Sequence, residues 1–317
     1  MKKRRNDLIQ LAILVVLGTA VILSLVLPQL PGRERELQLL ELSVIFREAD
    51  TSLWSNTRLG MEQAAGDLGA ELRFLTVTQT GDSGEQAELI RREVEGGAGA
   101  LVVVPADPEQ LGARLNETAG DHPVVSIESS MEGAGLVVAP DNEALGRQLA
   151  EEVLADWTGG TVLLLDTAGE STGVAERLDG AEAVLTQAGV PVLRQTAVPD
   201  RLATGLQRLS SVKEAAAIMA FEPYATEQTI RAVEASGLGQ LIYGVGVSAY
   251  VVGALERGSV AAVAAWSDYA AGYLAAEGAI RLARGEQYTA EALPFTVVRG
   301  EDIYDPDNQK LLFPVTS

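Results

Sequence analysis

The chain has 317 residues, a formal charge of −20, no cysteine and a single histidine, His122. A body this acidic repels nucleic acid and anionic lipid. The lack of cysteine excludes thiol nucleophiles, thiolate metal sites, disulfides and a lipidated N-terminal cysteine. The length allows one large or two medium domains, and we expect two.

The first element is an apolar run at residues 8–27 that contains no charge. About twenty apolar residues match a bilayer core of roughly 30 Å. Four basic residues precede the run, so the positive-inside rule predicts a cytoplasmic N-terminus and a body outside the cytoplasm. A cleavable signal peptide is the alternative, but the run is longer than usual and no small-x-small site follows it. We therefore expect residues 1–35 to form a basic tip, a single transmembrane anchor helix and a short stalk.

From Leu42 onward, short β-branched or apolar runs alternate with helical patterns, which is typical of βαβ units and parallel sheets. Strands are predicted at 42–46, 72–77, 100–104, 123–127, 135–139, 161–165, 190–195, 216–221, 240–245, 260–265 and 295–298. Helices are predicted at 52–68, 142–155 and 225–235, and Ser83 with Gln86 indicates a further helix start.

The two halves of this series resemble each other. Residues 60–64 with Gly69 recur as 180–183 with Gly189, in the same order of strand, loop and helix. The sequence thus predicts an α/β fold of two Rossmann-like lobes with parallel sheets. Ligands of such sheets bind outside the carboxyl ends of the strands, which would face each other across a cleft.

Several segments together resemble a known family. They are Gly60-Met61-Glu62 with 68–72, Gly97 to Pro105, Pro123 to Ile127, Pro140 to Gly146, and Glu176 to Gly180. Their order and spacing are similar to the sugar-binding, ribose/galactose-binding-like branch of type I periplasmic binding proteins, the substrate-binding proteins of ABC importers. The resemblance covers nearly all of 42–299.

This resemblance implies three hinge crossings between the lobes, near Asp141, Ser267 and Pro294. It places 42–140 plus 267–292 in the N-terminal lobe and 141–266 plus 293–317 in the C-terminal lobe. It also implies a monomer that traps its ligand by lobe closure.

In the family, aromatic faces grip a sugar ring and planar polar side chains bind its hydroxyls. The corresponding positions here are Asp50, Ser52, Trp54, Glu128, Ser129, Arg177, Glu222, Tyr224 and Trp266. Glu222 and Tyr224 stand where the family usually has an Asn-Asp pair, Pro223 cannot supply the family's carboxylate, and Gly246 and Trp266 stand where Asp and Gln are common. Because carboxylates outnumber Arg177, an amine-bearing ligand is a variant beside a sugar or polyol.

Other interpretations of these residues remain open. Asp141 is better explained as a helix N-cap than as a ligand, and Trp54 and Trp266 are large rings that also suit a packing role. Arg177, Glu128 and Glu222 each have an alternative as solvated loop or helix-start residues.

No sequence pattern indicates catalysis. A cysteine, a histidine pair, a phosphate-binding glycine loop and a nucleophile elbow are all absent from the sequence. We expect no enzyme activity, no metal site and no cofactor. A transcription regulator of this fold would need a basic DNA-binding headpiece where this chain has an apolar segment. The two functions left open are a receptor that delivers solute to an ABC permease and a sensor that signals to a membrane kinase or chemoreceptor.

Overall fold

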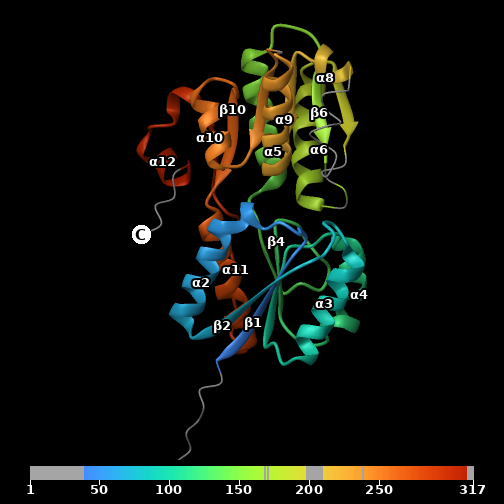
Figure 1. The fold of residues 1–317 in the computed structure, drawn as a ribbon, viewed down its shortest axis with the longest axis vertical. Coiled ribbons are helices and arrows are strands. Elements are labelled where there is room, and N and C mark those ends of the chain that lie inside the picture. Colours follow the sequence, from blue (N-terminus) through green and yellow to red (C-terminus); the bar gives the residue numbers. More distant parts are fainter. Residues whose placement is uncertain (1–38, 168, 170, 198–209, 238, 313–317) are drawn as a thin grey trace, which may run out of the picture. The chain divides into compact units, whose positions relative to one another are not determined.

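The computed structural model describes residues 39–167, 169, 171–197, 210–237 and 239–312, and the body begins at Leu40. The anchor predicted at 8–27 lies outside these residues. Within the described part, no helix has both the length and the apolarity that a membrane span requires. The body contains two β-sheets, each covered by helices (Figure 1).

The first sheet has the strand order β2-β1-β3-β4-β5, and all its strands are parallel. Its strands are β1 (Leu40–Phe46), β2 (Ala70–Thr76), β3 (Ala100–Val103), β4 (Val124–Ile127) and β5 (Leu136–Val138). Its helical elements are η1 (Ser52–Trp54), α2 (Ser55–Leu68), α3 (Ser83–Glu95), α4 (Pro108–Thr118) and α11 (Asp268–Ala283).

Side chains of β1 alternate between the two faces of this sheet, as the two-residue period of a strand requires. Leu42, Val44 and Phe46 pack against α2 and α11, whereas Ile45 packs against α3 and α4. The two pairs of helices cover opposite faces (Figure 1). Burial on both sides explains why β1 is mostly apolar and does not alternate between apolar and polar residues after Ser43.

The second sheet has the order β11-β10-β9-β8-β6-β7. Its strands are β6 (Val162–Asp166), β7 (Val192–Thr196), β8 (Ala217–Ala220), β9 (Leu241–Val245), β10 (Ala262–Trp266) and β11 (Phe295–Arg299). Its helical elements are α5 (Asn142–Asp156), α6 (Thr172–Gln187), α8 (Ser210–Glu214), α9 (Pro223–Ser236), α10 (Ala249–Glu256), η3 (Gly300–Asp302) and α12 (Pro306–Leu312). Helices α5 and α6 cover one face, and α9, α10 and α12 cover the other.

The structure confirms a two-lobe α/β fold and places a strand at every predicted position. It corrects two details. The second sheet is mixed, because β11 runs antiparallel to β10. Helix α3 is capped by Asp82, whose carboxylate accepts a hydrogen bond from the Glu85 amide, and not by Ser83. Gln86 is buried and bonds the backbone of Val104 and Ala106 instead.

Glycines let the helices approach each other closely. A Cβ at Gly146 of α5 would lie 1.8 Å from the carbonyl oxygen of Arg177 on α6. One at Gly60 of α2 would lie 2.0 Å from the carbonyl oxygen of Tyr269 on α11. These close contacts fix the positions of α5 and α6 and of α2 and α11, and these helices carry residues of the site described next.

Candidate functional site

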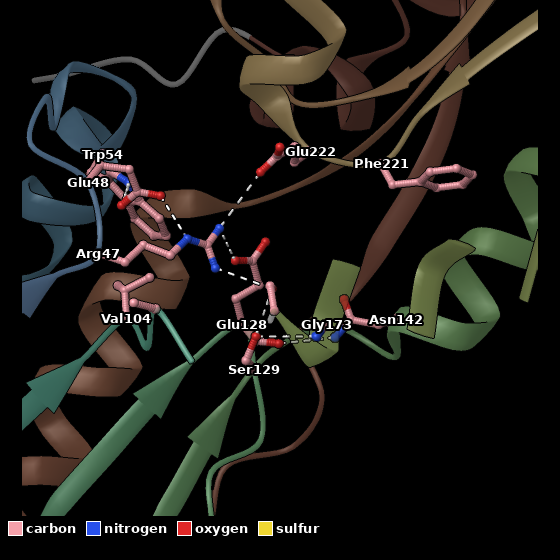
Figure 2. Close-up of polar contacts among 12 residues, drawn as sticks. Arg47, Glu48, Trp54, Val104, Glu128, Ser129, Asn142, Gly173, Phe221 and Glu222 are labelled. Atoms are coloured by element: carbon pink, nitrogen blue, oxygen red, sulfur yellow. Dashed lines mark hydrogen bonds and ion pairs between the residues drawn. The ribbon is translucent and has the colours of Figure 1, made fainter. Parts of the chain in front are cut away.

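The carboxyl ends of strands from both sheets bring charged side chains together. Arg47 and Glu48 follow β1, Glu128 follows β4, and Glu222 follows β8. Arg177 joins them from the second turn of α6. Figure 2 shows the Arg47 guanidinium pointing toward the three glutamates. We call these five side chains the charge cluster.

Ion pairs between the two arginines and the three glutamates link the cluster. The Arg47 guanidinium lies 2.8 Å from the Glu48 carboxylate, 2.7 Å from that of Glu128 and 3.9 Å from that of Glu222. The other oxygen of Glu128 lies 3.1 Å from Arg177. The pairs connect residues of the first sheet to residues of the second.

The cluster is mostly buried. Arg177 is 0% exposed, Glu128 8%, Arg47 11%, Glu222 13% and Glu48 24%. Arg177 also donates to the side-chain oxygen of Asn142 at 2.8 Å and to the Phe221 carbonyl at 2.9 Å. Buried charges are tolerated only when paired and hydrogen-bonded in this way.

The ionisation of the glutamates differs with their surroundings. Burial opposes the charge of Glu128, but the guanidiniums of Arg47 and Arg177 outweigh it and lower its pKa. Burial raises the pKa of Glu222 to about 7, and its weaker contact with Arg47 only partly offsets that. Burial also raises the pKa of Glu48. Glu128 is thus the fixed anion of the cluster, whereas Glu222 titrates near neutral pH.

Glu128 adopts a strained backbone, with φ of 70°. Non-glycine residues rarely occupy this region, and the strain concentrates at functional sites. Neighbouring bonds hold it: the Glu128 amide donates to Val138 O at 3.0 Å, and the Ser129 hydroxyl lies 3.0 Å from that of Ser171. The Gly173 amide also donates to the Ser129 hydroxyl at 3.2 Å. Ser129 therefore aligns the loop after β4 with the start of α6.

Two tryptophans border the cluster. Trp54 donates its indole N–H to Glu48 at 3.1 Å and packs on Phe46, with ring centroids 5.5 Å apart. The guanidinium carbon of Arg177 lies 4.8 Å from the ring centroid of Trp266. Each ring thus contacts both the apolar core and a charged group, which combines the packing and site roles considered for them.

Three of the expected ligand residues outside the cluster are exposed. Asp50 is exposed, and its carboxylate accepts from the Ser52 amide at 2.9 Å. Ser52 is exposed on η1, and Tyr224 is 37% exposed.

The expected hinge residues lie where the chain passes between the sheets. Asp141 caps α5 by accepting from the Ala144 amide at 2.9 Å, as its spacing predicted. Ser267 caps α11 in the same way, through Ala270 at 3.1 Å. Pro294 follows Leu293, which forms an isolated bridge with Pro140.

Sequence reasoning missed Arg47, Glu48, Asn142 and Asp268. Arg47 and Glu48 directly follow the apolar run of β1, and a charged pair at that position is itself a signal of a strand-end site. Asp268 follows Trp266 by two residues and begins α11. Burial raises the pKa of its carboxyl to about 7, and Glu128 adds to this effect.

A cavity of about 770 Å³ has Pro223, which follows Glu222 in the chain, in its lining. Its lining includes Ser52, Leu53, Ser55, Asn56, Pro223, Val247, Ser248, Val252, Glu256, Asp268 and Leu312. Residues associated with both sheets therefore form its wall, and its volume lies within the range of small-molecule sites. Among the described residues, no cluster of histidines and carboxylates is suited to a metal ion.

Solved structures share this fold. A carbohydrate transporter solute-binding protein from Agrobacterium radiobacter, in complex with D-arabinose, has a TM-score of 0.78 and 18% identity over 87% of this chain and 99% of its own. An ABC transporter solute-binding protein from Agrobacterium vitis, with bound D-fucose, has a TM-score of 0.79 and 18% identity over 86% and 100%. The Caulobacter myo-inositol binding protein has a TM-score of 0.75 and 20% identity over 86% and 97%.

A comparison with curated proteins finds no match. The family described as periplasmic binding protein domain matches residues 42–287, which include both sheets up to β10 and all of α11. The chain therefore belongs to the periplasmic binding protein domain family.

Proposed function

We propose that the protein is a solute-binding protein that captures a sugar or polyol between its lobes and delivers it to an ABC-type importer. One observation carries this proposal. In the described part of the chain, the cluster keeps a buried donor, Arg177 Nη2, and a buried acceptor, Glu222 Oε1, without hydrogen-bond partners. A ligand hydroxyl both donates and accepts, so a polyhydroxylated ligand matches such a mixed set.

The structural relatives support the same ligand class. Those named above were solved with D-arabinose, D-fucose and myo-inositol. The planar guanidinium of Arg177 and the Trp266 ring beside it suit a hydroxylated ring with apolar faces. We infer binding without catalysis, because the cluster's function can be explained by recognition alone.

Lobe closure is the proposed signal to the importer. We propose lobes of 42–140 with 267–292 and of 141–266 with 293–317, hinged at Asp141, Ser267 and Pro294. Arg47 pairs with Glu128 of its own lobe and lies 3.9 Å from Glu222 of the other. A ligand that bridges the same groups would favour the closed arrangement.

We further propose that residues 8–27 anchor the protein as a single span, with the body outside the cytoplasm. The uncharged run and the four basic residues before it support this topology. Membrane fractionation tests it: the full chain should sediment with membranes, and a chain lacking residues 1–35 should not. Recovery of both forms in the soluble fraction would contradict the anchor.

Calorimetry tests the binding function directly. The full chain, in a mild detergent, is titrated with D-arabinose, D-fucose and myo-inositol. At least one should bind, and Arg177→Met should weaken it by at least about tenfold, since a buried charged donor is lost. Arg194→Met, which removes an arginine paired with Asp166 outside the cluster, is the matched control. Absence of binding by all three sugars would count against the proposal.

A further inference from the structure

The charged residues that line the cavity are all acidic. Its charged lining residues are Asp268 and Glu256, and within the described part of the chain its lining contains no lysine, arginine or histidine. Ser52, Ser55, Asn56 and Ser248 add neutral polar groups. The neutral polar groups of the wall can form hydrogen bonds with hydroxyls. The two charged groups of the wall, Asp268 and Glu256, are both negative.

Of the two carboxylates, Asp268 is the one positioned to pair with a positively charged ligand group. It begins α11 and lines the cavity. The structure gives its side chain no ion pair or hydrogen bond among the described residues. The positive charge that acts on its pKa is Arg177, which is already paired with Glu128 and lies over Trp266. Asp268 is thus a partly buried carboxylate whose potential cation partner is engaged elsewhere.

Acidic side chains also outnumber basic ones around the cleft, which again favours a positively charged ligand. Glu48, Glu128, Glu222 and Asp268 face two guanidiniums, those of Arg47 and Arg177. Arg47 lies closest to Glu48 and Glu128, and the Oε1 atom of Glu222 has no hydrogen-bond partner. The two acids left without a close cation partner, Glu222 and Asp268, are the two whose pKa burial raises to about 7. A ligand with a positive charge would stabilise their ionised forms.

A carboxylate in the first turn of a helix has a simpler explanation, because it is favoured by the helix dipole. That explanation predicts a lowered pKa, whereas the pKa of Asp268 is raised. Burial beside Glu128 outweighs the dipole, so the position of Asp268 costs stability in the absence of a partner.

We propose that the cleft selects an amine-bearing sugar or polyol, whose ammonium group pairs with Asp268. This inference rests on the proposed function and specifies its ligand class. The ring or chain of the ligand carries the hydroxyls that bind the charge cluster, and the ammonium occupies the cavity at the start of α11.

The experiment compares matched pairs that differ in one group. The full chain is titrated by calorimetry with D-glucosamine against D-glucose, D-galactosamine against D-galactose, and 1-amino-1-deoxysorbitol against sorbitol. At least one amine should bind about tenfold or more tightly than its hydroxyl counterpart, which is the effect of one charged hydrogen bond. N-acetylglucosamine, which lacks the charge, should lose the advantage.

Two variants assign the effect to Asp268. Asp268→Asn should abolish the preference for the amine and leave the affinity for the neutral partner within about twofold. Glu109→Gln is the control, because Glu109 is an exposed acid in the first turn of α4 and should change neither affinity. A purely structural role for Asp268 would instead weaken both members of a pair equally.

The outcomes separate the two proposals. Neutral members that bind as tightly as their amines would overturn the amine inference and leave the proposed function standing. A preference that survives in Asp268→Asn would overturn the assignment to that residue. Absence of binding by every compound would overturn both.

Discussion

The carboxylate of Glu128 lies 3.1 Å from the buried guanidinium of Arg177 and so joins the loop after β4 to helix α6 of the other sheet. Arg177 is fully buried, and its remaining bonds go to Asn142 and Phe221. The pair is therefore part of the contact between the lobes and not a surface ion pair. The contribution of this ion pair to the free energy of unfolding can be measured separately from ligand binding.

We expect Arg177→Met to lower the free energy of unfolding by about 3 kcal/mol or more, because it leaves the Glu128 carboxylate buried with one partner fewer. Urea denaturation monitored by circular dichroism measures this. The double variant Arg177→Met with Glu128→Met should recover part of the loss, since neither charge of this pair is then left buried and Arg47 keeps its ion pair with Glu48. Arg194→Met, at a 37% exposed arginine, should cost less than about 1 kcal/mol. Equal losses at the two arginines would contradict the buried-pair account.

Two glycines on α2 should respond oppositely to alanine. Gly60→Ala would place a Cβ 2.0 Å from the Tyr269 carbonyl oxygen and force α2 away from α11, so we expect a loss of about 1–3 kcal/mol. Gly66 has nothing within 4 Å of the added Cβ. Gly66→Ala should therefore gain about 0.5–1 kcal/mol from helix propensity. Thermal unfolding of both variants checks the difference in sign.

The fold could be read from the sequence because its signal is local. Four of the five residues at 42–46 are apolar because both faces of β1 are covered, and Asp141 precedes a helix with the spacing of an N-cap. The direction of β11 could not be read. A strand that follows a crossover can enter the sheet either way, and its apolar pattern is the same in both.

The site was only partly predictable. Glu128 and Glu222 were proposed because a family resemblance placed them at strand ends, and Arg177 because the segment Glu176 to Gly180 resembles the same family. Arg47 was missed, since neither composition nor periodicity shows that a charged side chain will turn inward to meet carboxylates that are distant in sequence. The raised pKa of Asp268 has the same origin, because burial is a property of the tertiary structure and not of the residue's neighbours in the chain.

The stability of the ligand-free protein should fall as pH rises from about 4.5 to about 7. Burial raises the pKa of Glu222 and that of Asp268 to about 7, from ordinary values of 4.5 and 3.8. Between these values the folded state holds protons that the unfolded state has released, so rising pH favours unfolding. Glu128, whose pKa is lowered, affects stability only at more acidic pH. Thermal unfolding across this range should show a decline that Glu222→Gln makes shallower and Glu109→Gln leaves unchanged. A flat profile for the unmodified chain would contradict the burial of both acids.

Tryptophan fluorescence should report ligand binding through two of the three indoles. Trp54 is bonded to Glu48 and Trp266 lies against Arg177, so a ligand that rearranges the charge cluster changes the surroundings of both rings. Trp157 follows α5 and donates to the Gly160 carbonyl, outside the cluster. With any sugar found to bind by calorimetry, Trp157→Phe should keep the full fluorescence change, whereas Trp54→Phe and Trp266→Phe should each lose part of it. Loss of the response in Trp157→Phe alone would place the binding event away from the strand ends that carry Arg47 and Glu128.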